Sequence, residues 1–309
     1  MIDNVPVIDI AELESPSSLA AIDRACRDWG FFQVTGHGIE PGLLRSVFGV
    51  SREFFAQSRD EKRRIQRDAD NPWGYYDREL TKNRRDWKEI YDFGLADGDK
   101  LSPRWPAGYL RLRFEPIVRA YYANCRSLAL RLLSAMAANL DVGAGQLVRS
   151  FDEAHTSFLR FNYYPQCAAD SADDRPFGVG EHTDAGALTL LLQDEQPGLE
   201  VFREGRWYLV EPRQDALVIN IGDMIQVWSN DRYRAALHRV VTNPARDRYS
   251  VPFFLNPSYE TTYAPLPTTV SPQEPARYRP IRWREFRALR AAGDYADIGE
   301  EIQISHYRT

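Results

Sequence analysis

The residues best suited to chemistry are a histidine and an aspartate two positions apart, with a second histidine further along the chain. His182 and Asp184 flank a threonine, and His238 lies in the strand-like run LHRVV. In an extended segment the side chains at i and i+2 point to the same face, so both can reach one metal ion. An antiparallel neighbour in the same sheet can bring His238 alongside them.

Two imidazoles and one carboxylate are the ligand set of mononuclear non-haem Fe(II) oxygenase sites. Three ligands on one octahedral face leave the other positions open for a bidentate co-substrate and for O2. We therefore predict that His182, Asp184 and His238 bind Fe(II). A lone His-x-Asp tripeptide also occurs in surface turns, so the prediction depends on the residues around it.

A second pair of polar residues follows the distal histidine. Arg248 and Ser250 begin another strand-like run and face the same side of it. A guanidinium fork with a hydroxyl suits a carboxylate in a partly buried pocket, and arginine is better than lysine for this planar recognition. Their position after His238 therefore favours an anchored diacid over an exposed surface strand.

The elements that must position these residues change in character along the chain. The first half is mostly helical, with one helix ending near Trp29, one opened by Pro41 and a long one from about Arg113 to Leu140. After Ser157, short β-rich runs between turn residues predict a sandwich or jelly roll. The runs read as strands are FLRFNYY, ALTLLLQ, LEVFR, WYLVEP, ALVINIG, MIQVWS, LHRVVT and YSVPFFL. A proline-rich strap at 265–280 precedes a final helix near Trp283–Ala292.

Composition excludes several classes of protein. With 43% hydrophobic residues among 309, the chain can bury a substantial core. A net charge of −5 shows no basic excess of the kind that binds nucleic acid. Cys26, Cys125 and Cys167 form neither a disulfide framework nor a metal knuckle. Without a signal peptide or an apolar run long enough to span a bilayer, we expect a cytoplasmic protein with no membrane partner.

The ordered motifs resemble those of the isopenicillin N synthase-like, 2-oxoglutarate- and Fe(II)-dependent dioxygenases over nearly the whole chain. The similar segments are VPVIDI, CRDWGFFQVTGHGI, FNYYPQC, GEHTDAGALTLLLQDEQPGLEVF, LVINIGDMIQVWSND, LHRVV and RYSVPFFLNP. The resemblance implies a mixed α/β (α+β) fold: a double-stranded β-helix (jelly-roll) core with a helical N-terminal region and flanking helices. It implies one oxygenase unit over residues 1–309, with 1–110 as the N-terminal region and 155–260 as the core that carries the metal.

The resemblance also implies roles for residues and cofactors. The residues implied are His182, Asp184 and His238 for Fe(II), Arg248 and Ser250 for the distal carboxylate of 2-oxoglutarate, and Asn162 and Tyr164 for the co-substrate near the metal. The implied reaction uses O2 and couples oxidative decarboxylation of 2-oxoglutarate to hydroxylation, desaturation or ring closure of a small organic molecule. Ascorbate is a candidate reductant, and a monomer is expected because relatives of this build are often monomeric.

The substrate itself is not encoded in a recognisable motif. In the family, the segment that matches NPWGYYDREL lies by the pocket mouth, and an aromatic residue follows the Arg-x-Ser pair. The candidate substrate contacts are Trp73, Tyr75, Tyr76, Arg78 and Phe254, for which ordinary packing is the alternative. We interpret His37 as a turn residue and His155 and His306 as structural or exposed, and we assign Asn220, Gly222 and Asp223 to the fold.

Two other functions stay open on the sequence alone. Some relatives, such as isopenicillin N synthase and aminocyclopropane carboxylate oxidase, keep the Arg-x-Ser pair but bind iron through the substrate and do not use 2-oxoglutarate. A non-catalytic binding protein on the same fold is a third hypothesis, which the presence of every expected ligand disfavours.

Overall fold

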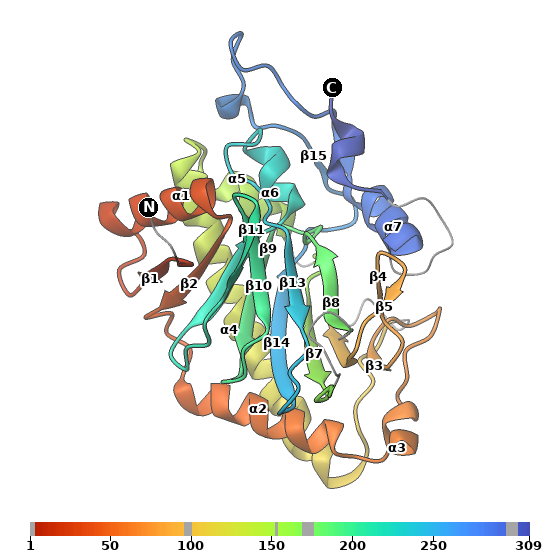
Figure 1. Ribbon diagram of the computed structural model, residues 1–309. Helices are drawn as coiled ribbons and strands as arrows, with labels where there is room; N and C mark the ends of the chain where they lie inside the picture. Colours follow the sequence, from red (N-terminus) through yellow and green to blue (C-terminus); the bar gives the residue numbers. More distant parts are fainter. Residues whose placement is uncertain (1–3, 96–100, 152–153, 169–175, 295–301) are drawn as a thin grey trace.

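The computed structural model describes residues 4–95, 101–151, 154–168, 176–294 and 302–309. Two β-sheets build its centre (Figure 1). The large sheet has the order β1 (Val7–Asp9), β2 (Phe31–Thr35), β12 (Leu217–Ile221), β9 (Leu188–Gln193), β14 (Arg248–Leu255), β7 (Phe158–Tyr164), β6 (Glu89–Gly94) and β3 (Gly74–Tyr76). The small sheet has the order β11 (Arg206–Leu209), β10 (Leu199–Arg203), β13 (His238–Val241) and β8 (Phe177–His182).

The strand pairing explains how the two halves of the chain join. Only β1 and β2 pair in parallel, and the other pairs within the two sheets are antiparallel. Strands from the N-terminal region form both edges of the large sheet, and strands from the later half form its centre. The predicted jelly-roll core with flanking helices is confirmed, and the N-terminal region extends one of its sheets.

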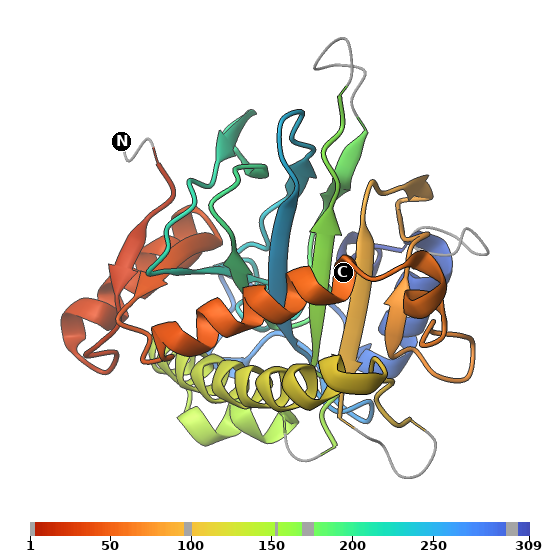
Figure 2. The same ribbon diagram turned by 90° about the horizontal axis from the view of Figure 1, so that it is seen from below.

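Helices cover one face of the large sheet. Figure 2 shows α2 (Pro41–Phe55) and the long α4 (Gly108–Asn139) crossing beneath the strands, and α1 (Pro16–Asp28) lies beside β1 and β2. The remaining α-helices described are short or C-terminal: α3 (Arg59–Arg63), α5 (Ala144–Val148), α6 (Asp223–Trp228) and α7 (Trp283–Asp294). Pro41 opens α2 as predicted, and Gly30, with φ of +61°, follows the end of α1.

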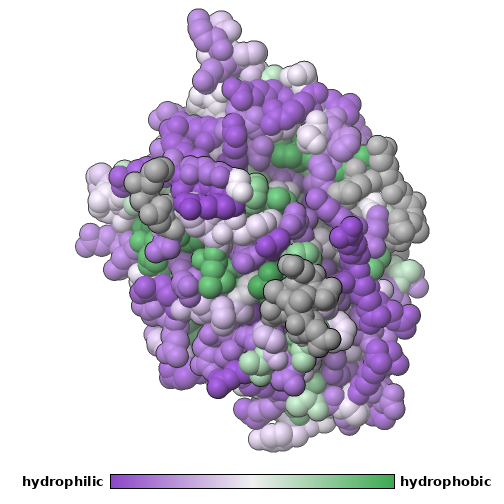
Figure 3. Space-filling view, in the orientation of Figure 1, coloured by the Kyte–Doolittle hydropathy of each residue, from purple (hydrophilic) through white to green (hydrophobic). Residues whose placement is uncertain are grey.

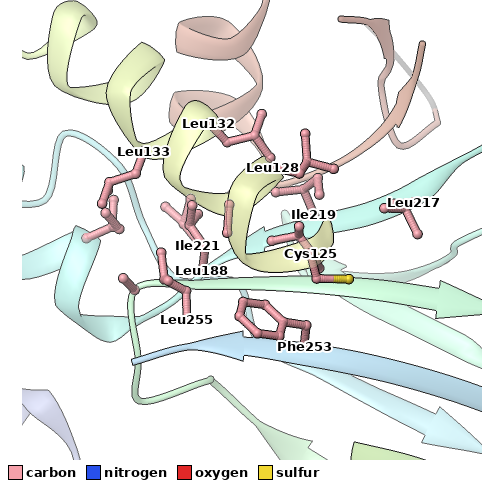
Figure 4. Packing of buried hydrophobic residues seen from close by; sticks show 14 of the residues in the cluster. Cys125, Leu128, Leu132, Leu133, Leu188, Leu217, Ile219, Ile221, Phe253 and Leu255 are labelled. Atoms are coloured by element: carbon pink, nitrogen blue, oxygen red, sulfur yellow. The ribbon is translucent and has the colours of Figure 1, made fainter. Parts of the chain in front are cut away.

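The main core lies between α4 and the large sheet. Apolar residues of α4 recur at helical spacing and pack on side chains from β9, β12 and β14 (Figure 4). The labelled residues are Cys125, Leu128, Leu132, Leu133, Leu188, Leu217, Ile219, Ile221, Phe253 and Leu255. Because side chains alternate along a strand, the opposite face of the same strands is free to line a cavity.

Some predicted elements differ from the structure. MIQVWS is not a strand but most of helix α6, because Met224, Ile225, Val227 and Trp228 are buried at helical rather than alternating spacing. Strand β8 was not predicted, since FGVGEH has few of the branched apolar residues that mark a strand. Ser15 caps α1, and its hydroxyl accepts a hydrogen bond from the backbone N–H of Ser18 at 3.2 Å.

The surface is mostly polar. The face drawn in Figure 3 is largely hydrophilic, with apolar side chains in small separate patches. None of the described helices is long and apolar enough to cross a membrane.

The burial of α4 predicts that Leu132→Ala lowers the free energy of unfolding by about 2–5 kcal/mol, because the side chain is fully buried and leaves a cavity. Urea unfolding followed by circular dichroism measures the change. Leu112→Ala on the same helix is the matched control, since Leu112 is 71% exposed and its truncation is expected to shift stability by less than about 0.5 kcal/mol. Equal losses in the two variants would contradict the packing described for α4.

Candidate metal centre and co-substrate pocket

The register of the small sheet brings two predicted metal ligands together. In the antiparallel pair β8–β13, His238 lies directly opposite His182, with 4.2 Å between the ring centroids. Asp184 follows β8, and its Oδ1 lies 3.6 Å from Nε2 of His182 and 3.9 Å from Nε2 of His238. One ligand atom from each residue lies within 4.8 Å of the others, which is the arrangement a single metal ion needs.

Backbone carbonyls fix the orientation of both imidazoles. Nδ1 of His182 lies 2.8 Å from the carbonyl oxygen of Gly180, and Nδ1 of His238 lies 3.0 Å from that of Ala236. A carbonyl only accepts, so each Nδ1 carries the proton and donates. Each Nε2 therefore presents its lone pair to the metal position, as metal-binding histidines do.

Two side chains for which the sequence analysis predicted no role at the metal hold the third predicted ligand. Oδ2 of Asp184 accepts hydrogen bonds from the hydroxyl of Thr189 at 2.5 Å and from Nδ2 of Asn220 at 2.8 Å. These bonds leave Oδ1 to face the two imidazoles. Asn220 was assigned to the fold, and the structure corrects this, because its amide orients Asp184, a predicted metal ligand.

The electrostatics keep His182 and Asp184 in the form that binds a metal. Burial, together with the neighbouring His238, lowers the pKa of His182 to about 3, so its imidazole is neutral. Burial alone raises the pKa of Asp184, but His238, His182 and the hydrogen bonds from Thr189 and Asn220 outweigh it and lower that pKa. Neutral imidazoles with an ionised carboxylate are the protonation states that coordination requires.

The large sheet brings the predicted co-substrate residues together in the same way. In the pair β14–β7, Arg248 lies opposite Tyr164, and Ser250 lies opposite Asn162. Nδ2 of Asn162 donates to the hydroxyl of Ser250 at 3.3 Å. The guanidinium carbon of Arg248 lies 5.2 Å from the centre of the Tyr164 ring, which restricts where the side chain can point.

Arg248 fits a bound carboxylate. Its side chain is 1% exposed, with Nε donating to the carbonyl of Gln196 at 3.2 Å and Nη2 to Oε1 of Gln193 at 3.1 Å. Nη1 has no hydrogen-bond partner, and within the described part of the chain no carboxylate pairs with this guanidinium. A buried cation without a direct ion pair is costly, so this position suits an anion such as the distal carboxylate of 2-oxoglutarate.

A cavity of about 1070 Å³ lies between the two sheets and joins the two sets of residues. Alternation along the strands explains its lining, because every second residue of β14 and β7 faces it while their neighbours pack in the core. The cavity residues on these strands are Arg248, Ser250, Pro252 and Phe254 on β14 and Phe158, Arg160, Asn162 and Tyr164 on β7.

The predicted substrate contacts divide into two groups. Trp73, Tyr76 and Phe254 line the cavity. Tyr75 and Arg78 do not: Tyr75 is fully buried and its hydroxyl donates to Glu89 at 3.0 Å, because alternation along β3 turns it into the core. The side chain of Arg78 is 62% exposed beside Asp77.

The remaining histidines lie where the sequence placed them or close to the cavity wall. Nδ1 of His37 accepts from the backbone N–H of Ile39 at 3.1 Å, as a turn histidine does. His155 accepts from Nε of Arg126 at 3.0 Å. His306 belongs to the capping box that begins the 3-10 helix Ile304–Tyr307 near the end of the chain. Of these, only His155 borders the cavity among the described residues, and Arg126 restrains it there.

Family models match both halves of the chain. The one described as the 2OG-Fe(II) oxygenase superfamily covers residues 155–257, and the one described as the non-haem dioxygenase in morphine synthesis N-terminal covers residues 5–108. Flavanone 3-dioxygenase 2 of Oryza sativa subsp. japonica is 35% identical over 291 residues, spanning 91% of this chain and 82% of the relative. The chain belongs to the 2-oxoglutarate- and Fe(II)-dependent oxygenases.

Two solved structures similar to this oxygenase contain the co-substrate. JOX2 in complex with 2OG, Fe and JA has a TM-score of 0.85 at 29% identity, covering 99% of this chain and 89% of that one. A full-length Neurospora crassa protein in complex with alpha-KG and thymine has a TM-score of 0.84 at 26% identity, covering 93% of this chain and 96% of that one. These likenesses support a 2-oxoglutarate-dependent enzyme over an oxidase that lacks the co-substrate or a protein without activity.

The oxygenase therefore couples oxidative decarboxylation of 2-oxoglutarate to oxidation of a small organic molecule. Fe(II) and 2-oxoglutarate, when bound, supply the activation of O2 and the electrons for its reduction, leaving succinate and CO2. Backbone carbonyls orient the two imidazoles among the predicted metal ligands, and Arg248 is the residue that would hold the far carboxylate of the co-substrate. The cavity walls would position the organic substrate and keep bulk water from the reacting atoms.

The contact between Asn220 and Asp184 predicts weaker metal binding in Asn220→Ala. Losing a hydrogen bond to a ligand typically costs about 10- to 100-fold in metal affinity. Anaerobic titration of the metal-free oxygenase with Fe(II) measures it. Gln33→Ala is the control, because Gln33 is an equally buried amide on neighbouring β2 that bonds the carbonyl of Glu211. If both variants bind Fe(II) as the parent does, Asn220 has no role at the metal.

Proposed function

We propose that the oxygenase oxidises a small organic acid with an apolar, ring-like body. The observation that carries this proposal is a cation, Arg287, which has no ion pair among the described residues and lies beside an aromatic wall of the cavity. The volume of the cavity agrees with a small organic substrate, since sites for small molecules usually measure about 300–1000 Å³. The cavity must also admit 2-oxoglutarate.

An aromatic wall offers a surface for the body of the substrate. Phe158 and Phe254 stack with their ring centroids 4.6 Å apart, and Trp73 lies 6.1 Å from Phe158 at a tilt. Aromatic faces of this kind favour flat or ring-shaped apolar groups, which they contact over a large area. The relatives named above have small organic ligands or substrates in their names, which agrees with such a body.

The polar wall of the cavity is electrically balanced. Arg160 pairs with Asp92 at 2.7 Å and with Glu79 at 3.0 Å, and Arg67 pairs with the same two acids at 3.3 and 3.2 Å. Burial raises the pKa of Glu79, but Arg160 and Arg67 outweigh it and lower that pKa to about 2, so the acid stays ionised. Two cations facing two anions attract no further net charge.

Arg287 differs from the cavity cations outside the co-substrate site. Lys88 pairs with Asp86 at 3.0 Å and Arg284 with Glu260 at 2.5 Å, whereas Arg287, like Arg248 in the co-substrate site, has no ion pair within the part of the chain that the structure describes. Its guanidinium carbon lies 5.7 Å from the centre of the Phe158 ring. A carboxylate on a ring-like substrate can therefore meet Arg287 while the ring contacts Phe158.

We also propose that the oxygenase acts as a monomer in the cytoplasm, without a nucleic-acid or membrane partner. Three free cysteines support a reducing compartment, because exported proteins usually pair theirs. The net charge of −5 supports the absence of a nucleic-acid partner.

The acid proposal predicts that ring-bearing carboxylic acids stimulate succinate release from 2-oxoglutarate more than their primary amides do. For the best acid, Arg287→Gln is expected to raise KM by about 10- to 100-fold, since a hydrogen bond between charged groups contributes about 1.5–3 kcal/mol. Steady-state succinate assays over the acid and amide panels provide the measurement.

Arg282→Gln is the matched control, because Arg282 precedes the same helix but its side chain is 71% exposed and does not line the cavity. Its KM is expected to equal that of the parent. Equal stimulation by acids and amides, or an unchanged KM in Arg287→Gln, would show that the substrate carries no anion at this position.

A further inference from the structure

A buried arginine of the C-terminal helix contacts the loop that carries the metal ligands. Arg290 lies on α7, which packs beside the loop after β8 (Figure 1). Its Nη2 donates to the carbonyl oxygen of Thr183 at 2.9 Å, and the residue is 1% exposed. Thr183 lies between two ligands, His182 and Asp184, so this bond holds the peptide that sets their spacing.

The same guanidinium also reaches a second anchor of the loop. It lies 3.6 Å from Oδ2 of Asp223, and both side chains are 1% exposed. The backbone N–H of Asp223 donates to the carbonyl of Asp184 at 2.7 Å. Two successive carbonyls of the ligand loop are thus held, one by Arg290 directly and one by the backbone of its ion-pair partner.

The backbone around Asp223 leaves little room for the loop to shift. The backbone N–H of Gly222 donates to the carbonyl of Ala187 at 2.8 Å, and a Cβ added at Gly222 would collide with the carbonyl oxygens of Gly186 and Asp184. Only glycine allows this approach. The start of α6 and the side chain of Arg290 therefore hold the ligand loop at separate points.

We propose that Arg290 is a positioning residue for the metal, through which α7 holds Thr183 and keeps His182 and Asp184 in binding geometry. Arginine suits this position because its fork serves the carbonyl, Asp223 and Gln303 together, which a single ammonium cannot do. Arg287, Ala288 and Ala291 on the same helix line the substrate cavity, so one element forms a wall of the cavity and supports the metal loop.

The test is metal binding by the folded protein, measured with Co(II) as an air-stable spectroscopic probe. Arg290→Met keeps the length of the side chain but removes every donor, and Arg290→Lys keeps the charge beside Asp223 but not the fork. We expect Arg290→Met to weaken Co(II) binding by about 10- to 100-fold and to alter the visible d–d spectrum, as loss of an outer-shell partner does. Arg290→Lys is expected to recover part of the affinity.

Ile281→Ala separates this role from simple support of the helix. Ile281 is 1% exposed in β16 (Ile281–Arg282), directly before α7, and has only an apolar side chain, so its truncation is expected to lower the urea midpoint while the Co(II) affinity and spectrum of the folded protein stay unchanged. Parent-like affinity and spectrum in folded Arg290→Met would overturn the proposal. If that variant does not fold, parent-like Co(II) binding by Arg290→Lys would overturn it equally.

Discussion

In the small sheet, β13 pairs with β8 so that His238 lies directly opposite His182, and the metal site depends on this register. A slip of one residue would turn one imidazole to the opposite face, because side chains alternate along a strand. The register alone leaves each ring free to rotate, and the carbonyls of Gly180 and Ala236 remove that freedom. The three predicted ligands thus converge on one point, and no ion pair with a cation of the described residues satisfies them there. A metal ion would supply the missing positive charge.

The two faces of the large sheet differ in polarity. One face is apolar because it packs on the helices, and the other carries polar residues because it lines the cavity. Alternate residues of β14 pack on α4, while Arg248 and Ser250 face the cavity. An arginine that is 1% exposed and has no ion pair with a carboxylate within the described residues carries a charge that is costly to leave unpaired. The packing of α4 fixes the opposite face of the strand, and the distal carboxylate of 2-oxoglutarate would supply the missing anion. Stability and recognition therefore come from opposite faces of the same strands.

Short-range spacing accounts for the part of this arrangement that the sequence predicted. The i, i+2 pairs His182/Asp184 and Arg248/Ser250 follow from local geometry, and the ordered motifs implied the jelly roll. Which strands pair is a long-range property, so the contact of Asn220 with Asp184 was not foreseen in an otherwise apolar strand. MIQVWS is too short for periodicity to separate helix from strand. Tyr75 could not be placed for a similar reason. The sequence showed that Tyr75 and Tyr76 point to opposite faces of their strand, but not which of the two faces the core.

The most direct test of the metal and co-substrate sites is an anaerobic titration of the Fe(II)-loaded protein with 2-oxoglutarate, followed by the visible metal-to-ligand charge-transfer band. We expect a saturable band in the parent protein and a much weaker apparent affinity in Arg248→Ala, which loses the cation predicted to hold the distal carboxylate. A protein that binds Fe(II) but shows no band at any 2-oxoglutarate concentration, or an Arg248→Ala variant that titrates like the parent, would contradict it.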